Sequence, residues 1–213
     1  MTERKMNYGK LTAGVIAAWF VIALCASALH LLRGAPGQPP IPILMAVLTP
    51  LVAFSIWYGS SKPFREWVLS LNPRTLTLIH AERIGGLVFL AMYTYKVLPG
   101  IFALPAGWGD IAVGATAYLA ATRLIPNRRR AFIAWQLFGV LDLAVALSMA
   151  AIASLLYPHG ITTAPMTELP LSLIPSFGVA LFLILHIICI AQARRWPAEV
   201  PRHIMYAAGS TGA

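Results

Sequence analysis

Four charged residues stand inside long apolar stretches of this sequence, namely Glu82, Arg83, Asp110 and Asp142. A charge in the hydrocarbon of a membrane costs roughly 2.5–3.5 kcal/mol on insertion scales, so it needs a partner, water or a function. Counted at about 1.5 Å per residue from the ends of their stretches, all four lie near the middle of the apolar layer. We therefore expect them to meet in one interior cluster.

Arg83 is the expected centre of this cluster. Glu82 is adjacent to it and points about 100° away around a helix, so these two cannot pair face to face. The planar guanidinium suits a bidentate bond with a carboxylate from another helix, either Asp110 or Asp142. One arginine and three ionised carboxylates carry a net charge of −2, so we expect at least one carboxyl group to be protonated near neutral pH. Such a group serves a proton relay or a purely structural hydrogen bond.

Two histidines extend the candidate site. His80 precedes Arg83 by three residues and shares its helix face, and His186 lies at a similar depth in the last apolar stretch. Two histidines at one depth on different helices meet the minimum requirement for a b-type haem. The alternatives are hydrogen-bonded core histidines and proton or ligand binding. A metal site of His80, Glu82 and His186 has no diagnostic ligand spacing to support it.

Small and aromatic residues accompany the charges. Gly85 and Gly86 follow Glu82 by three and four positions, so another backbone can approach there or leave a recess. Trp108 lies between two glycines beside Asp110, as in a pocket wall, although ordinary packing or interface anchoring is the commoner role of any single aromatic residue. Further amphipathic edges come from Tyr93, Tyr95, Trp135 and Gln136.

The amino-acid composition indicates that membrane-embedded helices position these residues. The chain has 213 residues, of which 59% are apolar and 11% charged, with a mean hydropathy of +0.75. Soluble domains carry about 25% charged residues, so this chain cannot cover a water-facing surface and lipid must surround the fold. A disordered chain, a secreted disulfide scaffold and a DNA-binding domain are excluded. Cys25 and Cys189 lie at different depths and are expected to be unpaired.

Six apolar stretches approach the length of about 20 residues that crosses the hydrocarbon core. We expect an all-α integral membrane bundle of six transmembrane helices, forming a single domain over residues 1–213. The spans are predicted at residues 11–32, 41–58, 76–98, 101–124, 131–157 and 169–193. Residues 63–71 predict a short helix in the membrane interface. Asn72 and Pro73 are typical of an N-cap and a first helical position.

The basic residues predict the orientation. Thirteen of the sixteen Lys and Arg residues fall in the two ends of the chain and in the second and fourth connections, which share one side of the membrane. Only Arg33 and Lys96 lie on the other side, and Arg83 lies within a span. The positive-inside rule then places both termini in the cytoplasm, in what we expect to be a bacterial cytoplasmic membrane. Anionic lipid headgroups account for the net charge of +9 without a nucleic-acid partner.

The first apolar stretch has an alternative interpretation as a cleaved signal peptide. Ala26, Ser27 and Ala28 have the small-x-small form of a cleavage site, and basic residues precede the stretch. The apolar run nevertheless exceeds the usual 7–15 residues of a signal peptide, which favours a retained span. Cleavage would leave five spans.

Two spans contain helix breakers. Pro105 with Gly107 and Gly109 falls in the fourth span, and Pro175 with Gly178 falls in the sixth. Such breaks often line cavities, although Pro and Gly are also common in membrane helices. The two halves of the chain show no inverted repeat, which weakens the most familiar transporter design.

These features favour a multi-pass membrane protein that binds or translocates a small polar or anionic solute, with proton coupling through the charged cluster. One alternative is a haem-binding redox subunit that uses His80 and His186. Another is a lipid-acting membrane enzyme, or an assembly subunit in which the cluster only fixes helix pairing. The sequence has no P-loop, nucleophile elbow, HExxH or CxxC motif, so its residues favour no familiar enzyme class.

Overall fold

The computed structural model describes residues 7–197, and every regular element in that range is helical. Arg4, Lys5 and Arg202, which belong to the basic set above, lie outside the described residues. The elements are α1 (Tyr8–Ala28), α2 (Ile41–Ser60), α3 (Lys62–Ser70), α4 (Pro73–Ile79), the 3₁₀ segment η1 (His80–Gly86), α5 (Leu87–Thr94), α6 (Gly100–Leu119), the π-helical η2 (Ala120–Leu124), α7 (Arg129–Leu156), the 3₁₀ turn η3 (Ala164–Thr167), the π-helical η4 (Ile174–Val179) and α8 (Ala180–Ala193).

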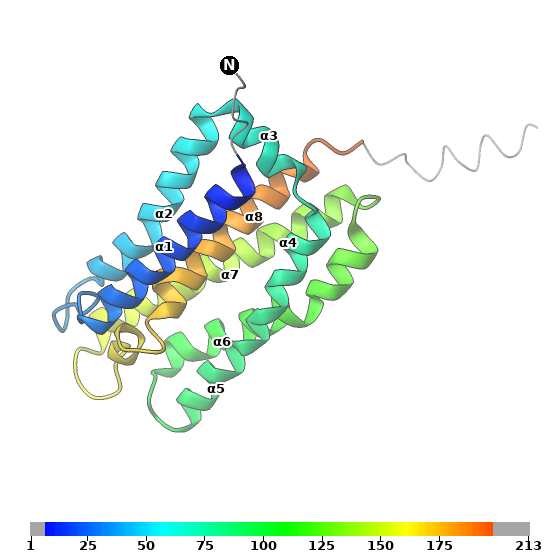
Figure 1. The fold of residues 1–213 in the computed structure, drawn as a ribbon. Coiled ribbons are helices and arrows are strands. Elements are labelled where there is room, and N and C mark those ends of the chain that lie inside the picture. The colour runs from blue at the N-terminus through cyan, green and yellow to red at the C-terminus, as the bar shows by residue number, and fades with distance from the viewer. Residues whose placement is uncertain (1–6, 198–213) are drawn as a thin grey trace, which may run out of the picture.

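The long helices lie side by side in one bundle (Figure 1). The short helix α3 lies at one end, and the connections at residues 29–40 and 157–173 lie at the other. Five helical stretches are long and apolar enough to cross a membrane: Tyr8–Ala28, Ile41–Ser60, Pro73–Thr94, Arg129–Leu156 and Ile174–Ala193. The all-α membrane class is therefore confirmed to the level of five candidate spans. Helix α6 is 20 residues long but falls outside this group, because its glycines, Pro105 and Asp110 lower its hydropathy.

Local sequence signals start the two helices at the α3 end. The Ser61 side chain caps α3 by accepting from the Phe64 backbone N–H at 3.3 Å, and Phe64 and Val68, one turn apart, are buried. Asn72 caps α4 by accepting from the Arg74 N–H at 2.9 Å, with Pro73 at the first helical position. The predicted capping at Asn72 and Pro73 is thus confirmed.

Glycines bring η1 close to α6. A Cβ on Gly114 would overlap with the backbone of Ile84, and one on Gly86 would lie 2.8 Å from the Gly107 carbonyl oxygen. Gly85 faces open space, so of the two glycines singled out in the sequence only Gly86 allows close approach. The reason is that neighbouring helical residues point about 100° apart. This contact places Arg83, in η1, directly against α6.

The two predicted helix breaks behave differently. Helix α6 runs continuously through Pro105, so the expected interruption of the fourth span is not present. Pro175 does disturb its helix, because residues 174–179 form the π-helical segment η4. A proline nitrogen has no hydrogen to donate, and a π-turn is one way for a helix to accommodate that loss.

Candidate functional site

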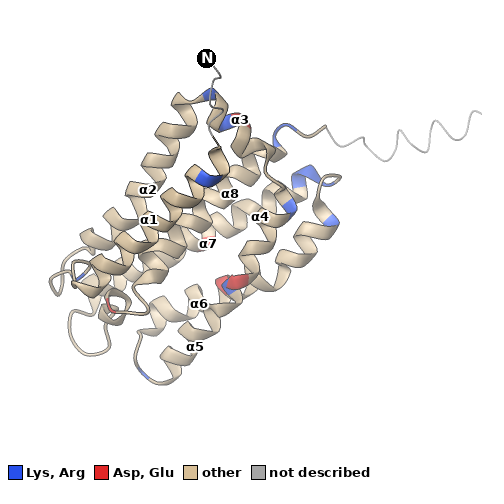
Figure 2. Ribbon diagram, in the orientation of Figure 1, with Lys and Arg blue, Asp and Glu red and all other residues tan. Residues whose placement is uncertain are grey.

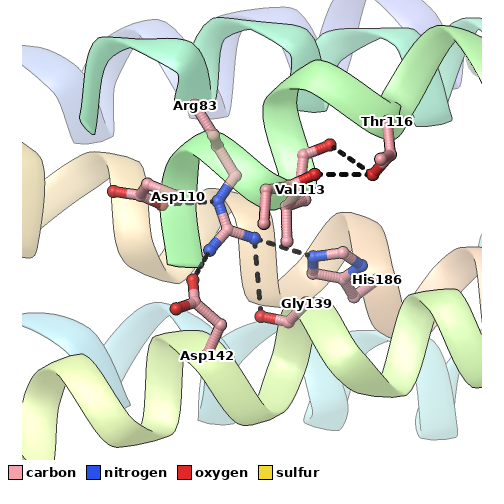
Figure 3. Close-up of polar contacts among 8 residues, drawn as sticks. Arg83, Asp110, Val113, Thr116, Gly139, Asp142 and His186 are labelled. Carbon is pink, nitrogen blue, oxygen red and sulfur yellow. Dashed lines mark hydrogen bonds and ion pairs between the residues drawn. The ribbon is translucent and has the colours of Figure 1, made fainter. Parts of the chain in front are cut away.

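Arg83 is the centre of a buried polar cluster that joins η1, α6, α7 and α8 (Figure 3). Its Nε donates to Asp110 Oδ1 at 2.7 Å, and its Nη2 donates to Asp142 Oδ2. Its Nη1 lies 3.4 Å from the carbonyl oxygen of Gly139 and 3.2 Å from Nε2 of His186. All three nitrogens of the guanidinium therefore have protein acceptors. We refer to Arg83, Asp110, Asp142 and His186 as the arginine cluster.

Two glycines make room for the arginine cluster. A Cβ on Gly109 would overlap with the carboxylate of Asp142, and a Cβ on Gly139 would overlap with the imidazole of His186. The side chains of Arg83 and Asp142 are only 1% and 7% exposed, whereas that of Asp110 is 16% exposed. Asp110 is therefore the member of the ion-paired trio that is open to its surroundings.

The hydrogen bonds of His186 fix which ring nitrogen carries the proton. Nδ1 faces the Oε1 atom of Gln136 at 2.5 Å, and Nε2 faces the Nη1 atom of Arg83. Because an amide oxygen only accepts and a guanidinium only donates, Nδ1 must be protonated and Nε2 must accept. His186 is thus neutral in this arrangement and adds no charge to the cluster.

His80 packs against the cluster without a hydrogen bond. Its ring is fully buried and stacks on the ring of His186, with centroids 3.9 Å apart and planes inclined by 20°. Trp135 and Phe182 cover its other sides at 5.9 and 5.4 Å. Neither ring nitrogen of His80 has a partner among the described residues.

The histidine geometry does not fit the haem that the sequence allowed. A bis-histidine haem has its macrocycle between the two ligand rings. Here the rings of His80 and His186 touch face to face, so no porphyrin plane fits between them. Residues 7–197 also contain no group of three or more His, Cys, Asp or Glu side chains that could hold a metal ion.

Two predicted site residues lie apart from the cluster. Glu82 is exposed on the outside of η1, because its neighbour Arg83 points inward. Trp108 is 62% exposed on the surface of α6 and does not form a wall beside Asp110. Without Glu82, the cluster contains one arginine and two carboxylates.

Asp110 faces a cavity, which we call the inner cavity. Its volume is about 70 Å³, and Asp110 is the only charged residue in its lining. The apolar walls come mainly from Ile43, Leu44, Phe89, Phe102, Leu143, Leu147, Met166, Ile174 and Val179. Asp110 Oδ1 is held by Arg83, but Oδ2 receives no hydrogen bond from the described residues and points away from the guanidinium in Figure 3.

A second cavity, the vestibule, lies at the end of the bundle opposite α3, next to the inner cavity. It has a volume of about 200 Å³ and is lined by residues of the 33–40 and 154–168 segments. Pro40, Thr163 and Thr167 line both cavities, so the two are neighbours, with the vestibule nearer the bundle end and Asp110 on the inner cavity. On the opposite side of the arginine cluster, the apolar core around Phe132 and Leu185 fills the bundle.

An exposed ion-pair network stands at the rim of the vestibule. Glu168 accepts from Arg33 Nε at 2.5 Å and lies 3.1 Å from His30 Nδ1. The hydrogen bond from Arg33, aided by the positive charges of Arg33 and His30, holds the pKa of Glu168 below its ordinary value of 4.5. This network ties the connection after α1 to the connection before η4.

Sequence reasoning undervalued Gln136 and missed Gly139. Gln136 was expected only as an amphipathic edge, yet it fixes the proton of His186. The signal was its position, because Gln136, Gly139 and Asp142 repeat every three residues on one face of α7. Nothing in the sequence indicated that the Gly139 carbonyl would accept from Arg83.

Comparison with known families gives a match over most of the chain. A family model described as a domain of unknown function (DUF8737) matches residues 39–194. This range extends from just before α2 to just after α8 and includes every residue of the arginine cluster. No curated protein and no solved structure matches the chain.

Proposed function

The chain belongs to the DUF8737 family, and we propose that it binds a small polar solute inside the membrane and moves it across in exchange for a proton held by the arginine cluster. One observation carries this proposal. A single buried guanidinium is paired with two carboxylates, one of which faces a cavity.

The number of acids exceeds what a structural clamp needs. One carboxylate neutralises one guanidinium, whereas Arg83 with both Asp110 and Asp142 ionised leaves a net charge of −1. A net charge in a low-dielectric interior is costly, and one proton on either carboxyl group removes it. The exposed part of Asp110 gives that proton a way in and out.

The cavities on the vestibule side of Asp110 favour alternating access. The inner cavity and the vestibule approach Asp110 from the end of the bundle opposite α3. Apolar packing around Phe132 and Leu185 fills the bundle on the other side. Transporters hold their site near the middle of the membrane and open it to one face at a time.

We further propose that the protein has six spans, namely the five candidate spans and α6. Short connections join α6 to α5 and to α7, which belong to candidate spans. Tyr93 contacts Gly100 while Asp142 contacts Gly109, and Trp135 donates to Thr116. These contacts run in antiparallel order along the two helix pairs, which supports α6 as a span that returns across the layer its neighbours cross.

The orientation proposal places the α3 end in the cytoplasm, with both termini on that side. In Figure 2 the Lys and Arg residues gather at the α3 end and at the turn between α6 and α7. The positive-inside rule assigns this end to the cytoplasm, here of a bacterial cell. Helix α3, with charged residues on one face and buried Phe64 and Val68 on the other, suits the membrane interface.

An anionic solute is the less supported version of this function. An anion would need a donor on Arg83 that it can reach, but each guanidinium nitrogen already has a protein acceptor and the side chain is 1% exposed. The atom of the site that lacks a hydrogen-bond partner among the described residues is instead Oδ2 of Asp110, which is an acceptor.

Proteoliposomes test the proposal. The purified full chain is reconstituted with an internal pH-sensitive dye, and small amines, amino acids and hydroxy compounds are added outside, with protein-free vesicles as the baseline. We expect wild type and the exposed-site control Glu82→Gln to couple solute entry to proton movement, and Asp110→Asn or Asp142→Asn to abolish the coupling. Wild-type proton movement in both aspartate variants would overturn the proton role.

A further inference from the structure

We infer that the inner cavity is a binding site for a small tertiary ammonium cation, whose single N–H donates to Oδ2 of Asp110. The inference rests on the proposed function, because the cation balances the same negative charge that the exchangeable proton balances. It names the class of solute that the site takes.

The walls of the inner cavity select an apolar body. Apart from Asp110, the polar residues of the lining are Thr163 and Thr167, which lie toward the vestibule. An apolar cavity of about 150 Å³ stays dry and binds benzene, which has six carbon atoms, so the 70 Å³ found here matches an apolar body of about three carbon atoms. Anions and solutes with several polar groups would lose hydration in this cavity without replacement bonds.

The single acceptor at the cavity end selects the head group. Asp110 Oδ1 already accepts from Arg83 at 2.7 Å, which leaves Oδ2 as one free acceptor. A primary ammonium has three N–H donors, and two of them would face apolar walls without a partner. A tertiary ammonium has one N–H and three carbon substituents, so one charge-assisted hydrogen bond satisfies it completely.

The charge of the arginine cluster selects the sign of the ligand. With Asp110 and Asp142 ionised, the cluster carries −1, and either a proton or an organic cation restores neutrality. The two therefore compete, and binding of the cation releases the proton. By linkage, protonation of the cluster weakens binding of the cation by the same factor.

Calorimetric titration of the full chain in lipid nanodiscs tests this site with trimethylammonium as the probe. The neutral acetone and the anionic acetate, each with four heavy atoms like the probe, are the size-matched controls. Titration in two buffers of different ionisation enthalpy measures the protons released. We expect wild type to bind trimethylammonium with release of up to one proton, and to bind the two controls at least tenfold more weakly.

Two kinds of variant locate the binding. Ala146→Phe fills the inner cavity, whereas Ala144→Phe adds the same ring on the exposed face of α7 and serves as its control. We expect Ala146→Phe and Asp110→Asn to weaken trimethylammonium binding at least tenfold and Ala144→Phe to leave it unchanged. If Ala146→Phe does not fold, Ala150→Leu, on the same wall, makes a smaller obstruction.

The outcomes separate the site from the proton role. Absence of trimethylammonium binding in wild type, or equal binding in the cavity-filling variants and Ala144→Phe, overturns the inference and leaves the proton site standing. Binding that depends on the cavity but releases no proton supports the cation site and overturns the proposed proton exchange.

Discussion

Arg83 donates through Nε to Asp110 and through Nη2 to Asp142, so one guanidinium joins η1 to both α6 and α7 in the interior of the bundle. The arrangement serves stability and chemistry together, because the same two carboxylates clamp three elements and carry one negative charge in excess. The following experiments separate these two roles.

Replacement of Arg83 by methionine should destabilise the fold strongly. Removing one partner of a buried ion pair costs about 3–5 kcal/mol, and here two carboxylates lose their counter-charge. Thermal unfolding in detergent measures the loss. The triple variant Arg83→Met, Asp110→Asn, Asp142→Asn should recover much of the stability, because no buried charge remains. An unfolding temperature of Arg83→Met equal to that of wild type would show that the ion pairs of Arg83 do not stabilise the fold.

Alanine at Gly139 should disrupt the site, whereas alanine at Gly85 should not. A Cβ at Gly139 would overlap with the His186 ring, which accepts from Arg83. Gly85 has no neighbour within 4 Å of the corresponding position, so Gly85→Ala is a matched control on a helical glycine. We expect Gly139→Ala to lower the unfolding temperature and Gly85→Ala to leave it unchanged or raise it slightly. Equal effects of the two substitutions would contradict the packing described.

The rim network predicts a pH effect on stability. The pKa of Glu168 is lowered in the fold, so its contribution to stability is present above its ordinary pKa of 4.5 and is lost as the pH falls through the lower value of the folded state. Unfolding temperatures of wild type and Glu168→Gln should therefore differ above pH 4.5 and converge in more acid solution. A difference that stays constant with pH would count against this ion pair.

The two connections that flank α6 test whether it crosses the membrane. Tyr95 precedes α6 and Asn127 follows it, and both residues are exposed. In a chain in which Cys25 and Cys189 are replaced by alanine, a membrane-impermeant maleimide should label Tyr95→Cys from outside intact cells. It should label Asn127→Cys only after permeabilisation. Labelling of both from the same side would remove α6 from the set of spans.

Helix positions followed from the sequence because length and apolarity set them. The predicted third, fourth and fifth spans overlap Pro73–Thr94, α6 with η2, and α7, with ends that differ by a few residues. Charge cost likewise indicated that Arg83 would meet aspartates from other helices. These inferences need only the chemistry of single residues and the thickness of a membrane.

The composition of the site and the shape of the cavity could not be predicted, because they depend on which face each helix turns toward the interior. Tertiary packing sets that orientation, and no local stretch of sequence encodes it. Glu82 and Arg83 are equally costly in lipid, yet η1 turns only Arg83 inward. The stacking of His80 on His186 depends on the packing of α4 and η1 against α8, and depth alone suggested haem ligation instead. The inner cavity has walls from most of the bundle, so no single stretch of sequence could have indicated it.

Infrared spectroscopy of the lipid-reconstituted full chain tests most directly whether the arginine cluster holds an exchangeable proton. The C=O stretch of a protonated carboxyl group should be present in wild type and in Glu82→Gln at neutral pH. It should be lost when either Asp110→Asn or Asp142→Asn is added to Glu82→Gln, because the remaining aspartate then pairs with Arg83 as an anion and Glu82, on the outer face of a candidate span, no longer contributes a band. A wild-type spectrum at neutral pH with no protonated carboxyl band would contradict the account.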